Sequence, residues 1–376
     1  MSVLHYLLIA AVGALVTFLV TPLVRRFAIS RGMVDTPGGR KVHSTPIPRL
    51  GGVAIFLGVM AAVAAQAAGE YFAGWGGTLV DGGTARVRIL GVLVAMAVVF
   101  LVGLIDDIVS LSPGVKLLGQ VVAAAIAVAS GLRIAYIGNP FGGGLVSLGL
   151  LAAPITLVYI VAFTNVINLI DGLDGLAAGV TGIAAVSLLL LAAQGNRLDA
   201  AVLAAAVIGT CAAFLRYNFH PASIFMGDSG ALFLGFTLSA ISLMGVMKST
   251  ATIALAVPLL IVGVPIFDTA SAIVRRILHS RPIQEADSGH IHHRLLGRGF
   301  NQTQTVLIIY VWCVALAVGG YTVRWAGGPF KVVAFGSLFV ITGFMAYWLG
   351  LFEAVQHPDD LREPKSREGG SRRTSK

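Results

Sequence analysis

The chain has 376 residues, of which 57% are hydrophobic and only 11% are charged. A soluble protein carries about a quarter of its residues as charged side chains, so this composition excludes an ordinary soluble globular protein and indicates a membrane protein. The two cysteines, Cys211 and Cys313, lie in apolar runs. We expect them to be buried as small hydrophobic residues and not to form a disulfide or a zinc site.

Taken in chain order, the sequence contains about eleven apolar segments that are long enough to cross a hydrocarbon layer of about 30 Å as helices. They are residues 4–24, 50–68, 87–105, 116–132, 151–168, 175–193, 198–216, 229–247, 251–274, 304–323 and 330–351. A helix satisfies its backbone hydrogen bonds internally, so the expected fold is an all-α integral membrane protein. The first segment lacks a basic start and a small-residue cleavage site, so we expect a retained helix.

The basic residues predict the orientation. Most of the 26 lysines and arginines fall on one side, in the polar tail and in the segments 25–49, 106–116, 216–228 and 275–303. The positive-inside rule makes that side cytoplasmic, with the N-terminus outside and the C-terminus in the cytoplasm. The net charge of +9 then reflects topology and attraction to anionic headgroups, and no nucleic acid is expected as a partner.

The same pattern predicts the domain organisation. We expect one polytopic membrane domain over residues 1–352 with cytoplasmic active-site loops. The remaining residues, 353–376, are polar and basic and are covered by no apolar run. We expect them to form a disordered cytoplasmic tail.

Four polar clusters lie at the cytoplasmic ends of the apolar segments. In chain order they hold Asp106 and Asp107; Asn165, Asn168, Asp171 and Asp174; Asp228; and Asp287, His290, His292, His293 and Arg294. Carboxylates at a membrane boundary are costly unless cations offset their charge, and oxygen-rich clusters suit Mg²⁺ or Mn²⁺. The basic residues, Lys116 among them, suit phosphate. Together these groups indicate phosphoryl-type transfer, in which catalysis is mostly positioning and charge stabilisation.

The clusters also have structural interpretations. Asp106 and Asp107 could cap a helix or be interfacial charges. The run "HIHH" could hold a transition metal, although no cysteine lies near it. Asp268 lies inside an apolar segment, so it is either a functional residue or the partner of Arg275 or Arg276 in an ion pair that fixes helix packing.

Over nearly its entire length, the chain resembles the polyprenyl-phosphate N-acetylhexosamine-1-phosphate transferases (glycosyltransferase family 4). The resemblance rests on five motifs in the same order, "RKVHSTPIPRLGG", "GLIDD", "NVINLIDGLDGLAAG", "FMGDSGALFLG" and "HIHHRLLGRGF". These integral membrane enzymes move a sugar phosphate from a UDP-sugar onto a phosphorylated polyisoprenol and release UMP. The "HIHH" motif resembles the bacterial branch that uses UDP-GlcNAc, whereas the sister branch that makes lipid I carries three consecutive histidines.

The resemblance also implies roles for individual residues. It implies metal ligation by Asp228, with Asn168 or Asp171 completing the protein side of a Mg²⁺ site, and Mn²⁺ is the alternative ion. It implies that Asp174 contacts the uracil. A part in catalysis, including contacts with the sugar and the diphosphate, is implied for Asp106, Asp107, Lys116, His290, His292 and His293. Substrate binding is implied for Asn165, Arg294, Lys41 and Arg49, the last two by recruiting the lipid phosphate or, alternatively, serving only as positive-inside charge.

The resemblance predicts an enzyme that transfers GlcNAc-1-phosphate from UDP-GlcNAc to undecaprenyl or decaprenyl phosphate, the first membrane step of an envelope polysaccharide pathway. The alternatives are synthesis of lipid I from UDP-MurNAc-pentapeptide and, from a different class, a secondary transporter, whose sites lie near the bilayer midplane. The sequence does not determine which polymer is served, how long the prenol is, whether the donor is UDP-GlcNAc or UDP-GalNAc, or whether the protein forms a homodimer. We expect direct attack by the lipid phosphate, because a phosphomonoester with a second pKa near 6 is already largely ionised; a covalent aspartyl intermediate is the rival.

Overall fold

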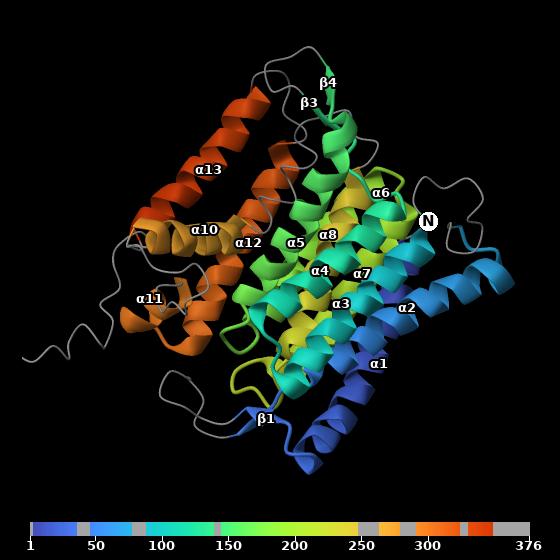
Figure 1. Ribbon diagram of the computed structural model, residues 1–376, viewed down its shortest axis with the longest axis vertical. Coiled ribbons are helices and arrows are strands. Elements are labelled where there is room, and N and C mark those ends of the chain that lie inside the picture. The colour runs from blue at the N-terminus through green and yellow to red at the C-terminus, as the bar shows by residue number, and fades with distance from the viewer. Residues whose placement is uncertain are drawn as a thin grey trace, which may run out of the picture.

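The structure is a computed structural model, and it describes residues 3–35, 46–76, 88–138, 144–246, 263–278, 291–323 and 330–348. Helices make up most of it (Figure 1). They are α1 (Val3–Ser30), α2 (Gly51–Ala73), α3 (Ile89–Val109), α4 (Pro113–Ala129), α5 (Ala152–Leu169), α6 (Leu176–Gln194), α7 (Leu198–Asn218), α8 (Gly227–Val246), α10 (Gly263–Leu278), α11 (Ile291–Gly297), α12 (Gln302–Val323) and α13 (Phe330–Trp348). A 3-10 turn, η1 (Gly149–Leu151), precedes α5.

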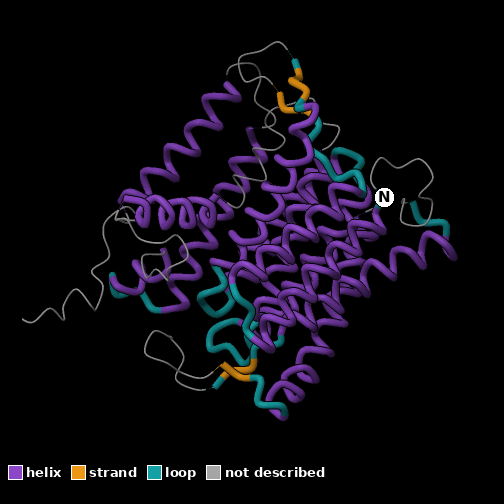
Figure 2. Tube along the Cα trace, in the orientation of Figure 1, coloured by secondary structure: helices purple, strands orange, loops and turns teal. Residues whose placement is uncertain are grey.

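Two short antiparallel hairpins mark the two ends of the helical bundle. β1 (Val34–Asp35) pairs with β2 (Ile47–Pro48), and β3 (Tyr136–Gly138) pairs with β4 (Leu145–Ser147). Figure 2 shows these strands in orange at opposite ends of the long helices. We call them the β1–β2 end and the β3–β4 end.

The protein is a multi-pass membrane protein. Within the described ranges, eight helices are long and apolar enough to cross a membrane: Val3–Ser30, Gly51–Ala73, Ile89–Val109, Gly149–Leu169, Leu176–Gln194, Leu198–Asn218, Gly227–Gly245 and Gln302–Thr322. Two shorter apolar helices, Pro113–Ala129 and Gly336–Met345, accompany them. Because leucines, valines and alanines cover all sides of these helices, lipid can solvate the outward faces while the inward faces pack.

Helix α8 is the central element of the bundle. In its spanning window, 89% of the residues are buried, a larger share than in any other described span. It packs against α2, α3, α5, α6 and α7. Such enclosure explains why its sequence alternates bulky residues with glycine and serine, which permit close helix contact inside a membrane. One polar link crosses the interior, where the hydroxyls of Tyr159 on α5 and Ser242 on α8 lie 2.7 Å apart.

Short connections at the β1–β2 end are set by local sequence. Helix α4 begins at Pro113, whose missing N–H is no loss in a first turn. Helix α6 follows Gly175 and α8 begins at Gly227, and these two glycines have φ values of +80° and +68°. Glycine adopts this left-handed conformation at little cost, so both helices start directly after a sharp turn. The polar residues next to these turns therefore lie close to the helix ends.

Each of the eleven predicted segments overlaps a helix, which confirms the all-α prediction, while the count of eleven spans stays a prediction. The ninth segment, 251–274, differs most. Its first twelve residues lie outside the described ranges, and the rest belongs to α10, which has 16 residues and carries Asp268. In Figure 1, α10 runs across the direction of α12 and α13 instead of along it. The predicted tail, 353–376, also lies outside the described residues.

Candidate active site

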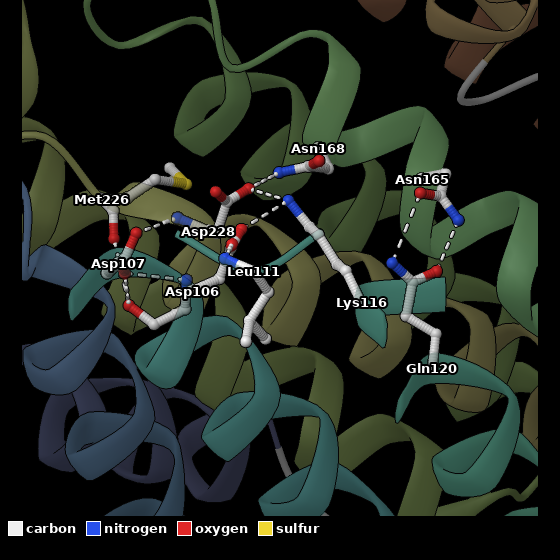
Figure 3. A network of polar contacts seen from close by, with 10 residues as sticks. Asp106, Asp107, Leu111, Lys116, Gln120, Asn165, Asn168, Met226 and Asp228 are labelled. Atoms are coloured by element: carbon white, nitrogen blue, oxygen red, sulfur yellow. Dashed lines mark hydrogen bonds and ion pairs between the residues drawn. The ribbon is translucent and has the colours of Figure 1, made fainter. Parts of the chain in front are cut away.

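Asp228 is the centre of a polar network at the β1–β2 end (Figure 3). Its Oδ1 accepts a hydrogen bond from Asn168 Nδ2 at 2.6 Å and lies 2.5 Å from Lys116 Nζ. The same ammonium group lies 3.0 Å from Oδ2 of Asp106. These residues come from the last turn of α3, the first turn of α4, the last turn of α5 and the first turn of α8. Four of the residues predicted for the site are therefore brought into direct contact.

Asp107 holds the start of α8 in place. Its Oδ1 accepts the backbone N–H of Asp228 at 2.7 Å, and its Oδ2 accepts both the N–H (3.0 Å) and the hydroxyl (2.6 Å) of Ser229. The first N–H groups of a helix have no partner within the helix, so a carboxylate placed there acts as a cap. The structural interpretation of the acidic pair thus applies to Asp107, although it caps a different helix from the one that carries it.

Close backbone contacts fix the same corner. A Cβ atom at Gly103 on α3 would lie 2.6 Å from the carbonyl oxygen of Asp228, and one at Gly52 on α2 would lie 2.2 Å from the N of Gly230. Backbone atoms cannot move aside as a flexible side chain can, so only glycine allows α2 and α3 to approach the start of α8 this closely. The position of Asp228 is therefore set by its neighbours' backbones.

The segment that leads into α2 runs beside this corner. Phe225 N–H bonds to the carbonyl of Pro48 at 2.7 Å, and Gly52 N–H bonds to the carbonyl of Met226 at 2.8 Å. Arg49, predicted to bind the lipid phosphate, therefore lies next to the turn that precedes Asp228, and its guanidinium is 3.7 Å from Asp35 Oδ1. Lys41, predicted for the same task, lies outside the described residues.

Asp171 lies in the turn between α5 and α6 and is half-buried. Burial raises the pKa of its carboxyl group to about 8, and the negative charges of Asp228, Asp107 and Asp174 add to the rise. A cation would offset this concentration of negative charge. Asp171 thus has the electrostatic surroundings expected of a cation ligand.

Asp174, predicted to contact the uracil, is held by the loop between α7 and α8. Its Oδ2 accepts hydrogen bonds from His220 Nδ1 at 2.7 Å and from the N–H of Ala222 at 3.0 Å. The next residue, Gly175, donates its N–H to Asn218 Oδ1 (3.1 Å) and accepts the hydroxyl of Tyr310 (2.6 Å). This corner is therefore tied to the end of α7 and to α12.

Asn165 was predicted to bind substrate, and the structure pairs it with Gln120. Its amide nitrogen donates to Gln120 Oε1 at 2.5 Å and to the carbonyl of Val161 at 2.8 Å. Gln120 lies one turn after Lys116 on α4, and Asn165 lies one turn before Asn168 on α5. Figure 3 shows this pair beside the Asp228 network, linking the same two helices. The contact positions Lys116 and Asn168 relative to each other.

The histidine motif is described only in part. His290 lies outside the described residues, and for His292 and His293 the structure describes the backbone, which belongs to α11. Arg294 lies on the same short helix. The first residue of α11, Ile291, donates its N–H to Asp268 Oδ1 at 2.8 Å. The intramembrane acid noted in the sequence therefore ties α10 to the helix that carries the histidine motif, while the side chains of Arg275 and Arg276 lie outside the description.

The donor set at the β1–β2 end fits a hard cation. Within the described part of the chain, no three histidine, cysteine, aspartate or glutamate side chains gather as a ready-made metal cluster. Magnesium does not require one, because it binds through one or two carboxylates and completes its shell with water and substrate phosphate. Asp228, Asp171 and the amide oxygen of Asn168 offer oxygen ligands only, which is the chemistry that Mg²⁺ prefers.

Three residues of this site were missed from the sequence: Gln120, His220 and Tyr310. Gln120 could have been found, because a buried amide four residues after Lys116 lies on the same helix face. His220 follows the last residues of α7 on the side where the other polar clusters lie, which is a weaker signal. Tyr310 gave none, because an isolated tyrosine in an apolar span is ordinary. Gln120 and His220 contact the predicted residues Asn165 and Asp174, and Tyr310 contacts Gly175, the neighbour of Asp174.

Comparisons with known proteins show the family of this chain. The family model described as glycosyl transferase family 4 matches residues 89–246, the stretch from α3 to the end of α8 that contains Asp106, Lys116, Asn168 and Asp228. The chain is 42% identical over 300 residues to a probable undecaprenyl-phosphate N-acetylglucosaminyl 1-phosphate transferase of Bacillus subtilis, which covers 80% of each chain.

Two further relatives extend the comparison. The decaprenyl-phosphate N-acetylglucosaminephosphotransferase of Mycobacterium tuberculosis is 37% identical over 333 residues, covering 83% of this chain and 81% of the relative. A phospho-N-acetylmuramoyl-pentapeptide-transferase of Desulforudis audaxviator is 32% identical over 342 residues, covering 84% and 96%. With such identity over four-fifths of the chain, and with the polar ends of α3, α4, α5 and α8 joined in one site, this protein belongs to glycosyl transferase family 4, the polyprenyl-phosphate sugar-phosphate transferases.

Proposed function

We propose that the protein transfers GlcNAc-1-phosphate from UDP-GlcNAc to a polyprenyl phosphate, giving polyprenyl-diphospho-GlcNAc and UMP. The observation that carries the proposal is the contact of Asp228 with Lys116 and Asn168 in a chain whose relatives carry this activity in their names. One substrate cannot leave the bilayer and the other cannot enter it. A site at one end of a membrane bundle is where the two can meet.

The proposed reaction is a single displacement at phosphorus. An oxygen of the lipid phosphate forms a bond to the β-phosphorus of UDP-GlcNAc, the bond from that phosphorus to the bridging oxygen breaks, and UMP leaves with the electron pair. The second pKa of a phosphomonoester is about 6, so the attacking oxygen is largely ionised at neutral pH. The protein therefore has to orient the two phosphates and stabilise charge, more than it has to remove a proton.

In this proposal the basic residues contact the diphosphate and the acidic residues bind the metal ion. Lys116 carries the positive charge nearest to Asp228, and Arg294 of α11 is a second cation for the diphosphate. Asp228, Asp171 and Asn168 would hold Mg²⁺, with Mn²⁺ as the alternative. When bound, the ion supplies positive charge that stabilises the diphosphate and the departing UMP. Asp106 keeps Lys116 in place through its contact at 3.0 Å.

The contacts of the acidic pair favour direct attack over a covalent aspartyl intermediate. Both carboxylate oxygens of Asp107 already accept hydrogen bonds from the start of α8, and Asp106 accepts the N–H of Leu111 at 2.6 Å as well as contacting Lys116. A nucleophilic carboxylate would have to give up these partners. The covalent path predicts exchange of label between UMP and UDP-GlcNAc in the absence of lipid, so an isotope-exchange assay on purified protein separates the two paths.

The principal test is release of UMP by purified protein in detergent, supplied with polyprenyl phosphate, Mg²⁺ and UDP-GlcNAc. We expect release to depend on the lipid and on Mg²⁺. Asp228→Ala is expected to lower kcat at least 100-fold, with a melting temperature close to that of the unaltered protein. A folded Asp228→Ala variant with normal turnover would remove Asp228 from the site.

The donor sugar is tested in the same assay. UDP-GlcNAc, UDP-GalNAc and UDP-MurNAc-pentapeptide are compared at equal concentration, and we expect UDP-GlcNAc to be used best. The relative from Desulforudis keeps the pentapeptide substrate in consideration, because its name states that activity. Preference for the pentapeptide donor would replace the proposal with lipid I synthesis. A protein that releases no UMP but carries a solute across liposomes would be a transporter.

We further propose that the β1–β2 end faces the cytoplasm, in the inner membrane of a bacterium, because the basic residues concentrate on that side. Both native cysteines are buried, so introduced cysteines report alone. Ser112, exposed beside α4, and Ser147, exposed on β4, lie at opposite ends. We expect a membrane-impermeant maleimide to label Ser147→Cys in intact spheroplasts and Ser112→Cys only after permeabilisation. The reverse pattern would invert the orientation.

A further inference from the structure

Only one carboxylate oxygen of Asp174, Oδ2, accepts hydrogen bonds from the described residues. Both of its hydrogen bonds, from His220 Nδ1 at 2.7 Å and from the N–H of Ala222 at 3.0 Å, go to Oδ2. Within the described part of the chain, Oδ1 accepts no hydrogen bond. A carboxylate can only accept, so the His220 ring nitrogen is the donor. These two hydrogen bonds fix the plane of the carboxylate, and Oδ1 can accept a hydrogen bond from another partner.

His220 covers this carboxylate from the outside. Its side chain is 41% exposed, whereas that of Asp174 is 10% exposed. The ring therefore lies at the surface of the site, and Asp174 lies just beneath it. No other described side chain forms an ion pair with Asp174.

The loop that carries His220 is itself held on both sides. Ser223 donates its N–H (2.8 Å) and its hydroxyl (2.9 Å) to the carbonyl of Tyr217, and Asn218 Nδ2 donates to the carbonyl of Ile224 at 3.0 Å. The same loop continues directly into Gly227 and Asp228. A residue on this loop thus connects the turn of Asp174 with the turn that presents Asp228.

We propose that His220 is a positioning residue that sets the selection of the nucleobase by directing Oδ1 of Asp174. This inference rests on the proposed function and on the uracil contact that the family resemblance implies for Asp174. Uracil presents one N–H donor, N3–H, between two carbonyl oxygens, whereas cytosine presents an acceptor at N3. A carboxylate oxygen held in a fixed direction accepts from uracil and repels cytosine. If the carboxylate can rotate, the discrimination is reduced.

The experiment compares His220→Ala with His220→Asn, whose amide nitrogen can donate from nearly the position of Nδ1. Ser223→Ala is the matched control, because it removes a hydrogen bond of the same loop that does not reach Asp174. We expect His220→Ala to raise the KM for UDP-GlcNAc about 10-fold, with kcat and the KM for polyprenyl phosphate changed less than about twofold. His220→Asn is expected to recover most of the loss.

Binding of UMP and CMP, measured by calorimetry on the same variants, needs no turnover. The preference for UMP over CMP is expected to fall about 10-fold in His220→Ala and to stay unchanged in Ser223→Ala. An unchanged preference in a His220→Ala protein that folds would overturn the inference while leaving the proposed reaction intact, as would equal losses in all three variants. If the unaltered protein does not distinguish UMP from CMP, the uracil contact of Asp174 is wrong and the role of His220 is wrong with it.

Discussion

Asp107 and Ser229 are joined by two hydrogen bonds across the interface of α3 and α8. Oδ2 of Asp107 accepts the N–H of Ser229 at 3.0 Å and its hydroxyl at 2.6 Å, and Oδ1 accepts the N–H of Asp228 next to it. These donors are first-turn amides without a partner inside their own helix, and that helix is the most enclosed of the described spans. The acidic pair at the end of α3 thus serves two purposes, because Asp106 contacts Lys116 instead.

This arrangement predicts that Asp107→Ala impairs folding and activity together. Removing the carboxylate leaves buried donors without an acceptor, which costs about 1–3 kcal/mol or more, and Asp228 loses its fixed position. We expect a lower melting temperature in detergent and a large fall in kcat. Ser229→Ala, which removes one donor and leaves no orphaned amide, is the control with the smaller effect. A normal melting temperature combined with loss of activity in Asp107→Ala would instead indicate a catalytic base.

A second prediction concerns the buried amide pair of Gln120 and Asn165. We expect Gln120→Leu and Asn165→Leu to destabilise the protein singly, and the double variant to cost less than their sum. Hydrogen bonds between membrane helices couple by about 0.6 kcal/mol on average and about 1.7 at most, which sets the expected coupling. A double-mutant cycle of melting temperatures measures it.

The same variants distinguish a positioning role of Asn165 from the substrate contact predicted from the sequence. A positioning role changes kcat similarly in both single variants, because each shifts Lys116 relative to Asn168. A direct contact with UDP-GlcNAc would raise its KM in Asn165→Leu and leave it unchanged in Gln120→Leu. We expect the first result, given the 2.5 Å bond between the two side chains.

Close packing of α3 against α8 gives a third prediction. A Cβ at Gly103 would lie 2.6 Å from the backbone of both Asp228 and Ser229, and backbone cannot yield. Gly103→Ala is therefore expected to cost about 1–3 kcal/mol of stability, or more, and to reduce kcat by displacing Asp228.

Gly114→Ala is the matched control for this substitution. It lies in the first turn of α4, and a Cβ there meets nothing within 4 Å. Because alanine favours a helix over glycine by about 0.5–1 kcal/mol, its stability should be unchanged or slightly higher. Melting temperatures of the two variants under one condition decide the matter. Equal stability of both would mean that α3 and α8 are not in close contact.

The sequence predicted which residues gather but not how they pair. The lengths of the apolar segments predicted most of the helices to within a few residues. The polar ends of these segments fell on one predicted side of the membrane. A contact between Lys116 and Asp228 could therefore be expected. The contact of Asp107 with the backbone of Asp228 could not be expected, because it joins positions 121 residues apart and depends on how α3 and α8 pack. The pairing of Asn165 with Gln120 and the contact of His220 with Asp174 were not predicted, for the same reason.

Helix α10 shows a different limit. Averaged over a window, residues 251–274 read as another apolar span, yet the described part is a 16-residue helix that lies across its neighbours. A window average measures how apolar a segment is and not in which direction it runs. Asp268, inside this helix, accepts the N–H of Ile291, a contact that no periodicity could indicate.

A fourth prediction follows from Asp171, whose pKa is raised from its ordinary value of 3.8 to about 8. Between these values the folded protein holds a proton that the unfolded chain has lost, so stability must fall as the pH rises from about 4 to about 8 and level off above it. We expect the melting temperature in EDTA to decline over this range. Asp171→Asn has no proton to lose and should show a flatter dependence.

Magnesium should abolish most of this decline, because a cation beside Asp171 stabilises the ionised carboxylate and competes with the proton. We therefore expect Mg²⁺ to raise the melting temperature more at pH 8 than at pH 6, and to do so far less in Asp171→Asn. All scans, at the two pH values and with EDTA or Mg²⁺, are run at one heating rate, because the melting temperature of an irreversible transition depends on that rate. An equal effect of Mg²⁺ on both proteins would place the ion away from Asp171, and a decline that persists in Asp171→Asn would assign it to another carboxylate.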